Sequence, residues 1–256
     1  MNPSSKFAAA VAIALLVGVG VTTAALNAAT KTPSSGPVRI TLEGSAPPRW
    51  NSFVQVFDGS FSAELDQNQA DQTSKVTISP VNIPLKNLHE AQITFWTYFQ
   101  TDHETGGHLW VPHVELVLDN GRWLTGDQNT SPVGAAKAAL TAIHSEDGQG
   151  YPSANLWTQM AVQACGLGDG QCGFYSDYAG ADPLVNPAWN INQPHNLADW
   201  AADPDFAGAK VVQVRIAYGG DPSAACNGGC TAYIDNASIG GRLVKIEPET
   251  ASTGGP

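Results

Sequence analysis

The chain has 256 residues and a formal net charge of −11, from 12 Lys and Arg against 23 Asp and Glu. This balance argues against nucleic acid as a partner, because phosphate binding needs clusters of Lys and Arg. Hydrophobic residues make up 43% of the chain, which is enough for a sizeable core, and the length suits one β domain after a short N-terminal segment.

The N-terminal 28 residues are typical of a secretory signal peptide. Lys6 precedes an apolar run from Phe7 to Val21, and small residues follow to Ala29. The run is short and rich in Ala and Gly compared with the ~20 apolar residues of a spanning helix, so a cleaved signal over residues 1–28 is favoured over an uncleaved anchor. We therefore expect a secreted protein at the extracellular surface, with no membrane partner after cleavage.

Residues 29–48 are predicted to be an extended linker that contains one strand. Thr30–Pro37 is rich in Pro and Ser, and Gly44–Pro48 isolates the strand on its other side. Such a strand can be the first strand of its own sheet, or it can leave and complete a neighbour's sheet by β-strand addition. In the second case, the side chains that set the register of this donor strand are Val38, Ile40 and Leu42.

Short strands separated by turn residues dominate the rest of the chain. They are predicted at Ser52–Phe57, Ser60–Leu65, Lys75–Ser79, Ala91–Gln100, Pro112–Leu118, Arg122–Thr125 and Asn155–Val162. Helices are expected only at Ser131–His144 and Asn196–Ala202. The pattern predicts an all-β fold, an antiparallel jelly-roll β-sandwich over residues 49–247 with one or two short helices in loop insertions and a flexible tail at 248–256.

The segment Lys210–Gly241 contains the clearest period-two pattern. In its first arm Val212, Val214 and Ile216 face one way, and in its second arm Ala232, Ile234, Ala237 and Ile239 do the same. The alternation breaks phase near Asn236. Since a period of two marks strands buried on one face, we expect the two arms to form a closing hairpin.

The four cysteines are expected to form disulfides, because their number is even and the chain is predicted to be exported. Three pairings are possible, and the one that is local in sequence joins Cys165 to Cys172 and Cys226 to Cys230. Zinc binding is the alternative, although the spacings C-x6-C and C-x3-C differ from the usual C-x2-C.

Aspartates in loops rich in Gly and Asn suggest a structural calcium ion, since Ca²⁺ takes several oxygen ligands from one loop region. The densest group is Asp169, Asp177 and Asp182. The alternative is ordinary Asx turns, in which each side chain caps its own backbone. A zinc-protease site is disfavoured, because His103-Glu104 and His108 have the spacing H-E-x-x-x-H with two glycines between them and cannot share a helical face.

Aromatic side chains raise the possibility of sugar binding, because the C–H faces of sugars pack on π systems. Trp96 and Tyr98 share one face of a strand. Trp110, Trp123, Trp157, Trp189 and Trp200 lie elsewhere and can either join such a platform or fill the core. The carboxylates available for glycoside hydrolysis, Glu64, Glu90, Glu104 and Glu115, sit in no recognisable motif, so the sequence predicts no enzyme.

The strand ITFWTYF, the segments VELVLDNG and NLADW, and the arms VVQVRIAYGG and TAYIDNASIGG together resemble a group of exported jelly-roll surface domains. These domains are similar in fold to carbohydrate-binding modules and include the cannula-type extracellular tubule subunits of hyperthermophilic archaea. The resemblance covers roughly residues 90 to 245. It implies a β-sandwich, assembly by donor-strand exchange, and calcium at subunit contacts. The chain departs from the group in its local Cys pairs and its insertion at Gly126–Gln193.

These features predict an extracellular structural subunit that assembles with other copies of itself into a filament, tube or surface layer. Donor-strand exchange through Val38–Leu42 would join the subunits, assisted by calcium. The alternative is a secreted carbohydrate-binding or adhesion module whose partner is a polysaccharide.

Overall fold

The computed structural model describes residues 37–53, 55–67, 72–99, 112–125, 140–142, 155–162, 173–176, 195–219 and 230–249. Contacts divide the chain into two units, Met1–Ser34 and Ser35–Pro256, and every described residue belongs to the second. The predicted signal peptide therefore lies outside the described residues. Within them, no helix has both the length and the apolar character that crossing a membrane requires.

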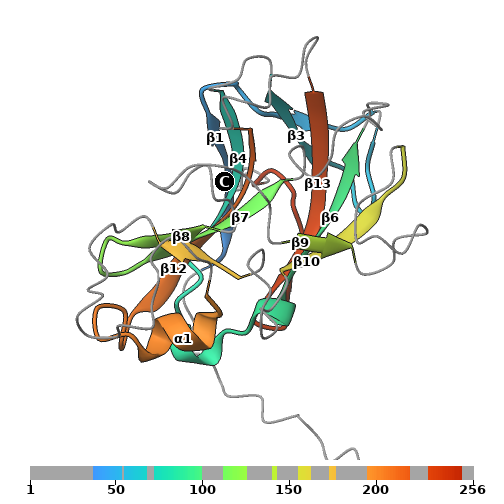
Figure 1. Cartoon of the computed structure of the whole chain (residues 1–256). Helices are drawn as coiled ribbons and strands as arrows, with labels where there is room; N and C mark the ends of the chain where they lie inside the picture. Colours follow the sequence, from blue (N-terminus) through green and yellow to red (C-terminus); the bar gives the residue numbers. More distant parts are fainter. Residues whose placement is uncertain are drawn as a thin grey trace, which may run out of the picture. The chain divides into compact units, whose positions relative to one another are not determined.

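The described residues of this unit form two antiparallel sheets (Figure 1). The first sheet has the order β1 (Arg39–Gly44), β4 (Thr73–Ser79), β12 (Lys210–Gly219), β7 (His113–Leu118), β8 (Trp123–Thr125) and β11 (Tyr175–Ser176), with β5 (Ile83–Pro84) also paired to β12. The second has the order β2 (Arg49–Asn51), β3 (Ser62–Gln67), β13 (Cys230–Ile239), β6 (Ile93–Phe99), β10 (Thr158–Val162) and β9 (Leu140–Ala142), with β14 (Arg242–Val244) also paired to β13. The described helices are short: η1 (Leu85–Asn87), η2 (Glu90–Gln92) and α1 (Leu197–Ala202). The fold is the all-β antiparallel sandwich that the sequence predicted.

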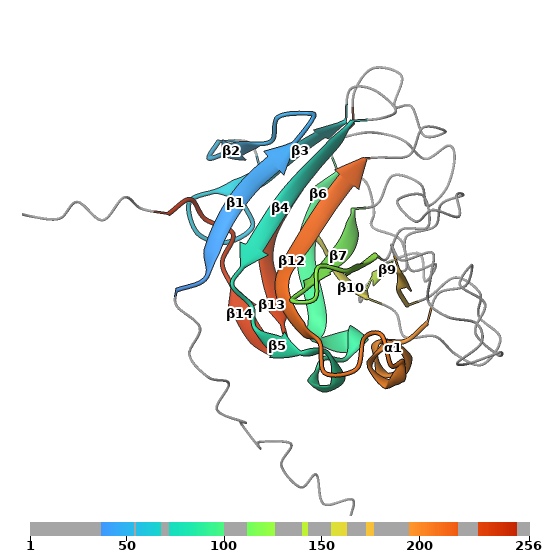
Figure 2. The same cartoon turned by 90° about the vertical axis from the view of Figure 1, so that its left-hand side faces the viewer.

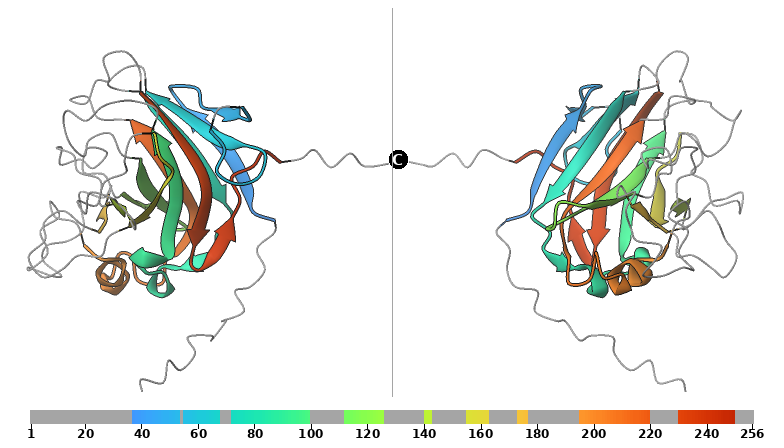
Figure 3. Two further views of the ribbon diagram at one scale, coloured as in Figure 1. Left: turned by 90° about the vertical axis from the view of Figure 1, so that its right-hand side faces the viewer. Right: turned by 60° about the vertical axis from the view of Figure 1, so that its left-hand side comes forward.

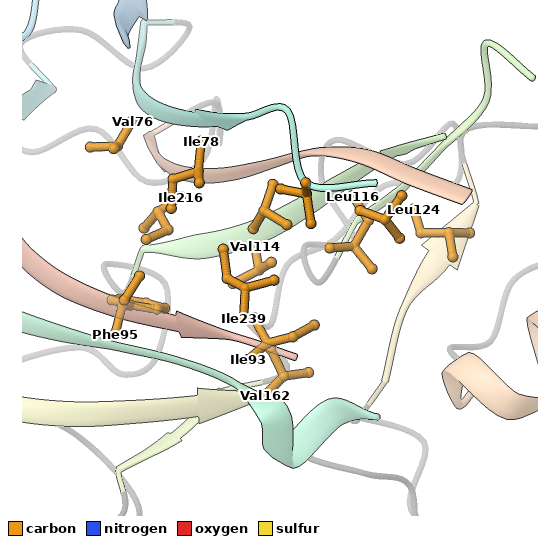
Figure 4. Packing of buried hydrophobic residues seen from close by; sticks show 14 of the residues in the cluster. Val76, Ile78, Ile93, Phe95, Val114, Leu116, Leu124, Val162, Ile216 and Ile239 are labelled. Atoms are coloured by element: carbon orange, nitrogen blue, oxygen red, sulfur yellow. The ribbon is translucent and has the colours of Figure 1, made fainter. Parts of the chain in front are cut away.

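The inward faces of the two sheets pack into one hydrophobic core. Figure 4 shows Ile78 and Ile216 of the first sheet and Phe95 of the second among the buried side chains. Because successive side chains of a strand point to opposite faces, the period-two pattern decides which residues enter this core. Burying one such Ile or Phe side chain contributes roughly 1.5–3 kcal/mol.

Both arms of Lys210–Gly241 are strands, and the second has the buried set that was predicted. Ala232, Ile234, Ala237 and Ile239 are all buried. The register shifts between Asp235 and Ala237, so the predicted break in phase at Asn236 is a β-bulge. In the first arm, a register shift between Val211 and Gln213 places Val211 rather than Val212 in the core.

The prediction that the two arms form a closing hairpin is wrong, because the arms lie in different sheets. β12 pairs with β4 and β7, whereas β13 pairs with β3 and β6. A period of two identifies the face that a strand buries but not its neighbours. A connection as long as residues 220–229 can cross the ~10 Å between two packed sheets.

Two further expectations need correction. Ser52–Phe57 is not a strand, because its described residues belong to the loop between β2 and β3, which we call the loop 52–61. Leu140–Ala142, the only described part of the predicted helix Ser131–His144, is the strand β9 and pairs with β10. Pairing with a neighbouring strand overrides the weak preference of an Ala-rich segment for helix.

The predicted donor strand is the edge strand of its own first sheet (Figure 2). β1 pairs with β4 from Arg39–Ser79 to Gly44–Ser74, and the partly buried side chains of Val38, Ile40 and Leu42 pack against the core of the same chain. This is the first of the two placements considered above. Exchange of the strand between subunits stays a prediction.

Candidate functional site

Five aromatic rings form a continuous cluster on the outer face of the second sheet, which we call the aromatic patch: Phe57, Trp96, Tyr98, Trp157 and Tyr233. The left panel of Figure 3 shows the sheet that carries them, with β6 in green beside β13 in red. Trp96 and Tyr98 belong to β6, Tyr233 belongs to β13, and Trp157 directly precedes β10. Phe57 comes from the loop 52–61. Its ring stacks on Trp96, with centroids 4.0 Å apart and planes inclined by 19°.

The remaining ring contacts join the patch from one end to the other. Trp157 lies 5.6 Å from Phe57 and 5.7 Å from Tyr98, and Tyr98 lies 6.0 Å from Tyr233. The two tyrosines are buried, whereas Phe57 is 40% exposed and both tryptophans are half-buried. The tyrosines therefore support three rings that present apolar surface to the solvent.

Asp235 fixes the loop that carries Phe57. Its carboxylate oxygen Oδ2 accepts hydrogen bonds from the backbone N–H groups of Phe57 at 3.0 Å and Asp58 at 3.1 Å, and Oδ1 accepts from the N–H of Asn236 at 2.7 Å. Asp235 has no exposed surface. Burial raises the pKa of Asp235, and the three N–H donors oppose this change. The Asp235 carboxylate on β13 thus accepts hydrogen bonds from loop N–H groups that would pair with a neighbouring strand if the segment were part of a sheet.

A second set of contacts holds the tip of the same loop. Glu247 Oε1 accepts a hydrogen bond from Ser60 N at 2.7 Å, and Asp58 Oδ2 lies 3.3 Å from Lys245 Nζ. Gly59 has a φ of 91° and an added Cβ there would lie 2.0 Å from Glu247 Oε1. The chain therefore bends at Asp58-Gly59 in a conformation that glycine adopts readily, and this bend shapes the tip of the loop.

Beside the patch, the outer face of the second sheet is acidic. Arg49 Nε donates to Glu64 Oε1 at 2.9 Å, and Arg49 Nη2 lies 3.4 Å from Asp66 Oδ2. Burial, followed by the charges of Glu64 and Asp66, raises the pKa of Tyr233 to about 12. The Tyr233 hydroxyl is therefore neutral at physiological pH, and the two carboxylates outnumber the one guanidinium beside it.

The outer face of the first sheet carries a buried ionic cluster around Glu115, whose side chain is 1% exposed. Lys75 Nζ donates to both Glu115 oxygens at 2.8 and 2.9 Å. His113 Nε2 lies 3.4 Å from Oε1, and Arg215 Nη1 lies 3.5 Å from Oε2. Burial alone would raise the pKa of Glu115, but His113 and Lys75 outweigh it and hold the pKa at about 2.

The carboxylates considered for glycoside hydrolysis do not face one another. Glu64 points outward from the second sheet and Glu115 points outward from the first, so the sandwich separates them. Glu90 accepts a hydrogen bond from Leu197 N at the start of α1. Glu104, His103 and His108 lie outside the described residues.

The other tryptophans have different places. Trp200 is part of the core, with its indole Nε1 donating to Phe174 O at 2.9 Å. Trp123 lies half-buried on β8 of the first sheet. Trp110 and Trp189 belong to segments that the structure does not describe. Sequence reasoning missed two members of the patch, Phe57 and Tyr233. The sequence pattern predicts a strand at Phe57 rather than a loop, and Tyr233 lies in an arm for which only the buried face was considered.

The predicted calcium and disulfide sites fall largely on undescribed segments. Asp169, Asp177, Asp182, Cys165, Cys172 and Cys226 all lie outside the described residues, and Cys230 only marks the start of β13. Both sites stay predictions. In the part of the chain that is described, no group of three or more His, Cys, Asp or Glu side chains could hold a metal ion.

No protein-family model matches the sequence, and neither does any curated protein. The solved structures that resemble the chain weakly include three of interest. They are a β-1,2-glucanase from Parabacteroides distasonis (10% identity, TM-score 0.37), a structure of carbohydrate-binding modules from the β-sandwich superfamily (10%, 0.33), and SGBP-B from a complex xyloglucan utilization locus in Bacteroides uniformis (9%, 0.33).

The matches cover 78%, 80% and 81% of this chain, but only 22%, 57% and 45% of the respective structures. The chain thus spans between about a fifth and just over half of their length. At these TM-scores and identities, nothing about this chain follows from the matches.

Asp235→Ala should release the loop 52–61, because two backbone N–H groups lose their acceptor. We expect fast amide hydrogen exchange at Phe57 and Asp58, a changed Trp96 fluorescence, and about 1–3 kcal/mol of lost stability. Asp235→Asn keeps one oxygen acceptor and should retain most of the protection. Equal protection in Asp235→Ala and the wild type would show that the carboxylate does not hold the loop.

The pKa of Glu115 predicts an acid-sensitive stability. Because its folded value of about 2 lies below the ordinary 4.5, ionised Glu115 stabilises the fold above pH 4.5, and this contribution, about 3 kcal/mol, is lost as the pH falls from 4.5 to 2. Urea unfolding across this range should show the loss in the wild type. Glu115→Gln should be less stable at pH 7, and its free energy of unfolding should fall less between pH 4.5 and 2. An equal fall in the variant and the wild type would contradict the prediction.

Proposed function

We propose that this chain binds an uncharged polysaccharide through the aromatic patch. The observation that carries this proposal is the continuous set of rings on one sheet face, in which Phe57, Trp96 and Trp157 keep exposed surface above two buried tyrosines. Ring faces of this kind pack against the C–H faces of sugars, and neighbouring polar groups fix the orientation of the sugar.

Polar side chains at the edge of the patch can supply such orientation. Asn155 Oδ1 lies 3.4 Å from the Tyr98 hydroxyl, and Gln159 Nε2 lies 3.5 Å from Thr94 Oγ1. Both side chains are at least partly exposed and can exchange these long hydrogen bonds for bonds to sugar hydroxyls.

The acidic side chains near the patch favour an uncharged ligand over an anionic one. Glu64 and Asp66 lie on the same outer face, and the exposed Asp58 follows Phe57 directly. A glycan with carboxylates or sulfates would meet like charges here, which weakens association. The net charge of −11 acts in the same direction.

Trp157→Ala should weaken binding to a neutral polysaccharide by roughly tenfold, which corresponds to about 1.4 kcal/mol. Phe57→Ala should have a comparable effect. Affinity electrophoresis in gels with xylan, hydroxyethylcellulose, laminarin or mannan checks this, with a gel that contains the sulfated polysaccharide carrageenan as the anionic comparison. Leu243→Ala removes an apolar side chain that is 63% exposed and carries no aromatic ring, and it serves as the control.

Retardation that survives both substitutions would rule out the patch as the binding surface. A lack of retardation by every neutral glycan tested would rule it out as well. Loss of retardation in Leu243→Ala as well would point to a general loss of apolar surface rather than to ring stacking.

Self-assembly is the second candidate function, and the position of β1 favours it. β1 is the last strand of the first sheet, and among the described strands none pairs with its other edge. An unpaired edge presents backbone groups that a second copy can use. Pairing through this strand, with calcium at the contacts and export to the cell surface, is the form that assembly would take.

Deleting residues 30–44 should abolish any polymers seen for the intact chain. Negative-stain microscopy with and without calcium, together with light scattering, measures this, and a thermal melt establishes that the shortened chain is folded. Polymers that persist after the deletion would exclude exchange of β1, and an intact chain that is monomeric under both conditions would exclude self-assembly.

A further inference from the structure

We propose that Arg215 and Thr77, on the outer face of the first sheet, form a second binding site that takes a carboxylate group of a ligand. This site is independent of the aromatic patch, because it lies on the other side of the sandwich. The register of the sheet places Thr77 of β4, Arg215 of β12 and Glu115 of β7 in one row across three adjacent strands. Figure 2 shows β4 and β12 side by side in this sheet.

Glu115 does not need Arg215 as its counterion, because Lys75 already fills that role. Lys75 and Glu115 lie two strands apart, on either side of β12. The β12 residue opposite Lys75 is Ala217, whose small side chain lets the Lys75 ammonium group reach across to both oxygens of Glu115. The carboxylate therefore has its charge paired and two short hydrogen bonds before Arg215 is considered.

Arg215 itself is only loosely bonded. Its Nη1 lies 3.5 Å from Glu115 and its Nη2 donates to Gln213 Oε1 at 3.3 Å. Its buried Nε has no acceptor, and the buried hydroxyl group of Thr77 has no hydrogen-bond partner. Thr77 is 1% exposed and lies directly opposite Arg215. A buried polar group without a partner costs about 1–3 kcal/mol.

A carboxylate is the ligand group that matches these unpaired hydrogen-bond donors of Arg215 and Thr77. Its two oxygens accept parallel hydrogen bonds from two nitrogens of one guanidinium group, and a hydroxyl can donate to either of them. The Arg215 side chain is 28% exposed and that of Lys75 is 22% exposed, so a rotation of Arg215 brings its donors to the surface. An ammonium ligand would instead be repelled by both cations.

Trp123 favours a carboxylate carried on a sugar, as in a uronic acid. It lies in the same row as Gln213, with Val117 of β7 between them, which corresponds to ~10 Å across two strand spacings. The half-buried Trp123 lies on the same face of the sheet, where a neighbouring sugar can contact the exposed part of its side chain. A small free carboxylate would use Arg215 and Thr77 without this ring.

Isothermal titration of the intact protein distinguishes these sources with three probes: trigalacturonate, its methyl ester and acetate. We expect the free acid to bind at least tenfold more tightly than the ester, because only the acid carries the charge. Binding of acetate with a similar affinity would identify the carboxylate alone as the ligand, and binding of the trimer only would identify a uronic acid saccharide.

Arg215→Gln should weaken trigalacturonate binding at least tenfold, and the isosteric Thr77→Val should weaken it severalfold. Arg215→Lys keeps the charge but loses the two-point geometry, so it should not restore the affinity; thermal melts establish that each variant is folded. Trp157→Ala, which disables the aromatic patch, should leave this binding unchanged. Absence of binding by both carboxylate probes, equal affinity for acid and ester, or unchanged affinity in Arg215→Gln would overturn the proposal, whatever the neutral polysaccharides show.

Discussion

The packing of two inward faces into one core is the constraint on which the other features of this molecule depend. The central strands bury alternate side chains in that core, for example Ile216 in β12 and Ile234 in β13. The residues between them must point outward. The outward-facing polar and aromatic side chains of the described sandwich are therefore distributed over two outer faces that the core keeps apart.

The two outer faces have taken opposite characters. The face of the second sheet gathers aromatic rings beside an excess of carboxylates, whereas the face of the first sheet gathers Lys75, Arg215 and His113 around the single buried carboxylate of Glu115. Asp235 of β13 determines part of the aromatic face of the second sheet. Its buried carboxylate holds the loop in which Phe57 stacks on Trp96. A buried acid on a central strand thus determines the shape of a surface.

The fold could be read from the sequence because burial on one face leaves a period-two pattern. That pattern located most strands, placed a break in phase near Asn236, where the structure has a bulge, and put Trp96 and Tyr98 on one face. It could not identify neighbouring strands, so the supposed hairpin of β12 and β13 was wrong. Partners depend on how the whole chain crosses between sheets, and no local pattern of residues records this.

The candidate sites were less accessible from the sequence for the same reason. Phe57 reaches the patch from a loop whose backbone N–H groups are held by Asp235, far along the chain. Glu115 was considered as a possible catalytic acid, while its partner Lys75 comes from a strand that is not even adjacent to β7. The Trp96–Tyr98 pair was visible beforehand because both residues lie on one strand, whereas contacts between strands required the register of both sheets.

The most direct test of polysaccharide binding through the aromatic patch is an NMR titration that follows the indole N–H signals of the tryptophans. A neutral oligosaccharide that binds the patch should shift the signals of Trp96 and Trp157 in a saturable manner. The signals of Trp200 in the core and Trp123 on the opposite sheet should stay in place. Saturable shifts confined to Trp123, or no shift at any tryptophan with the neutral glycans that retard the protein in gels, would contradict the account.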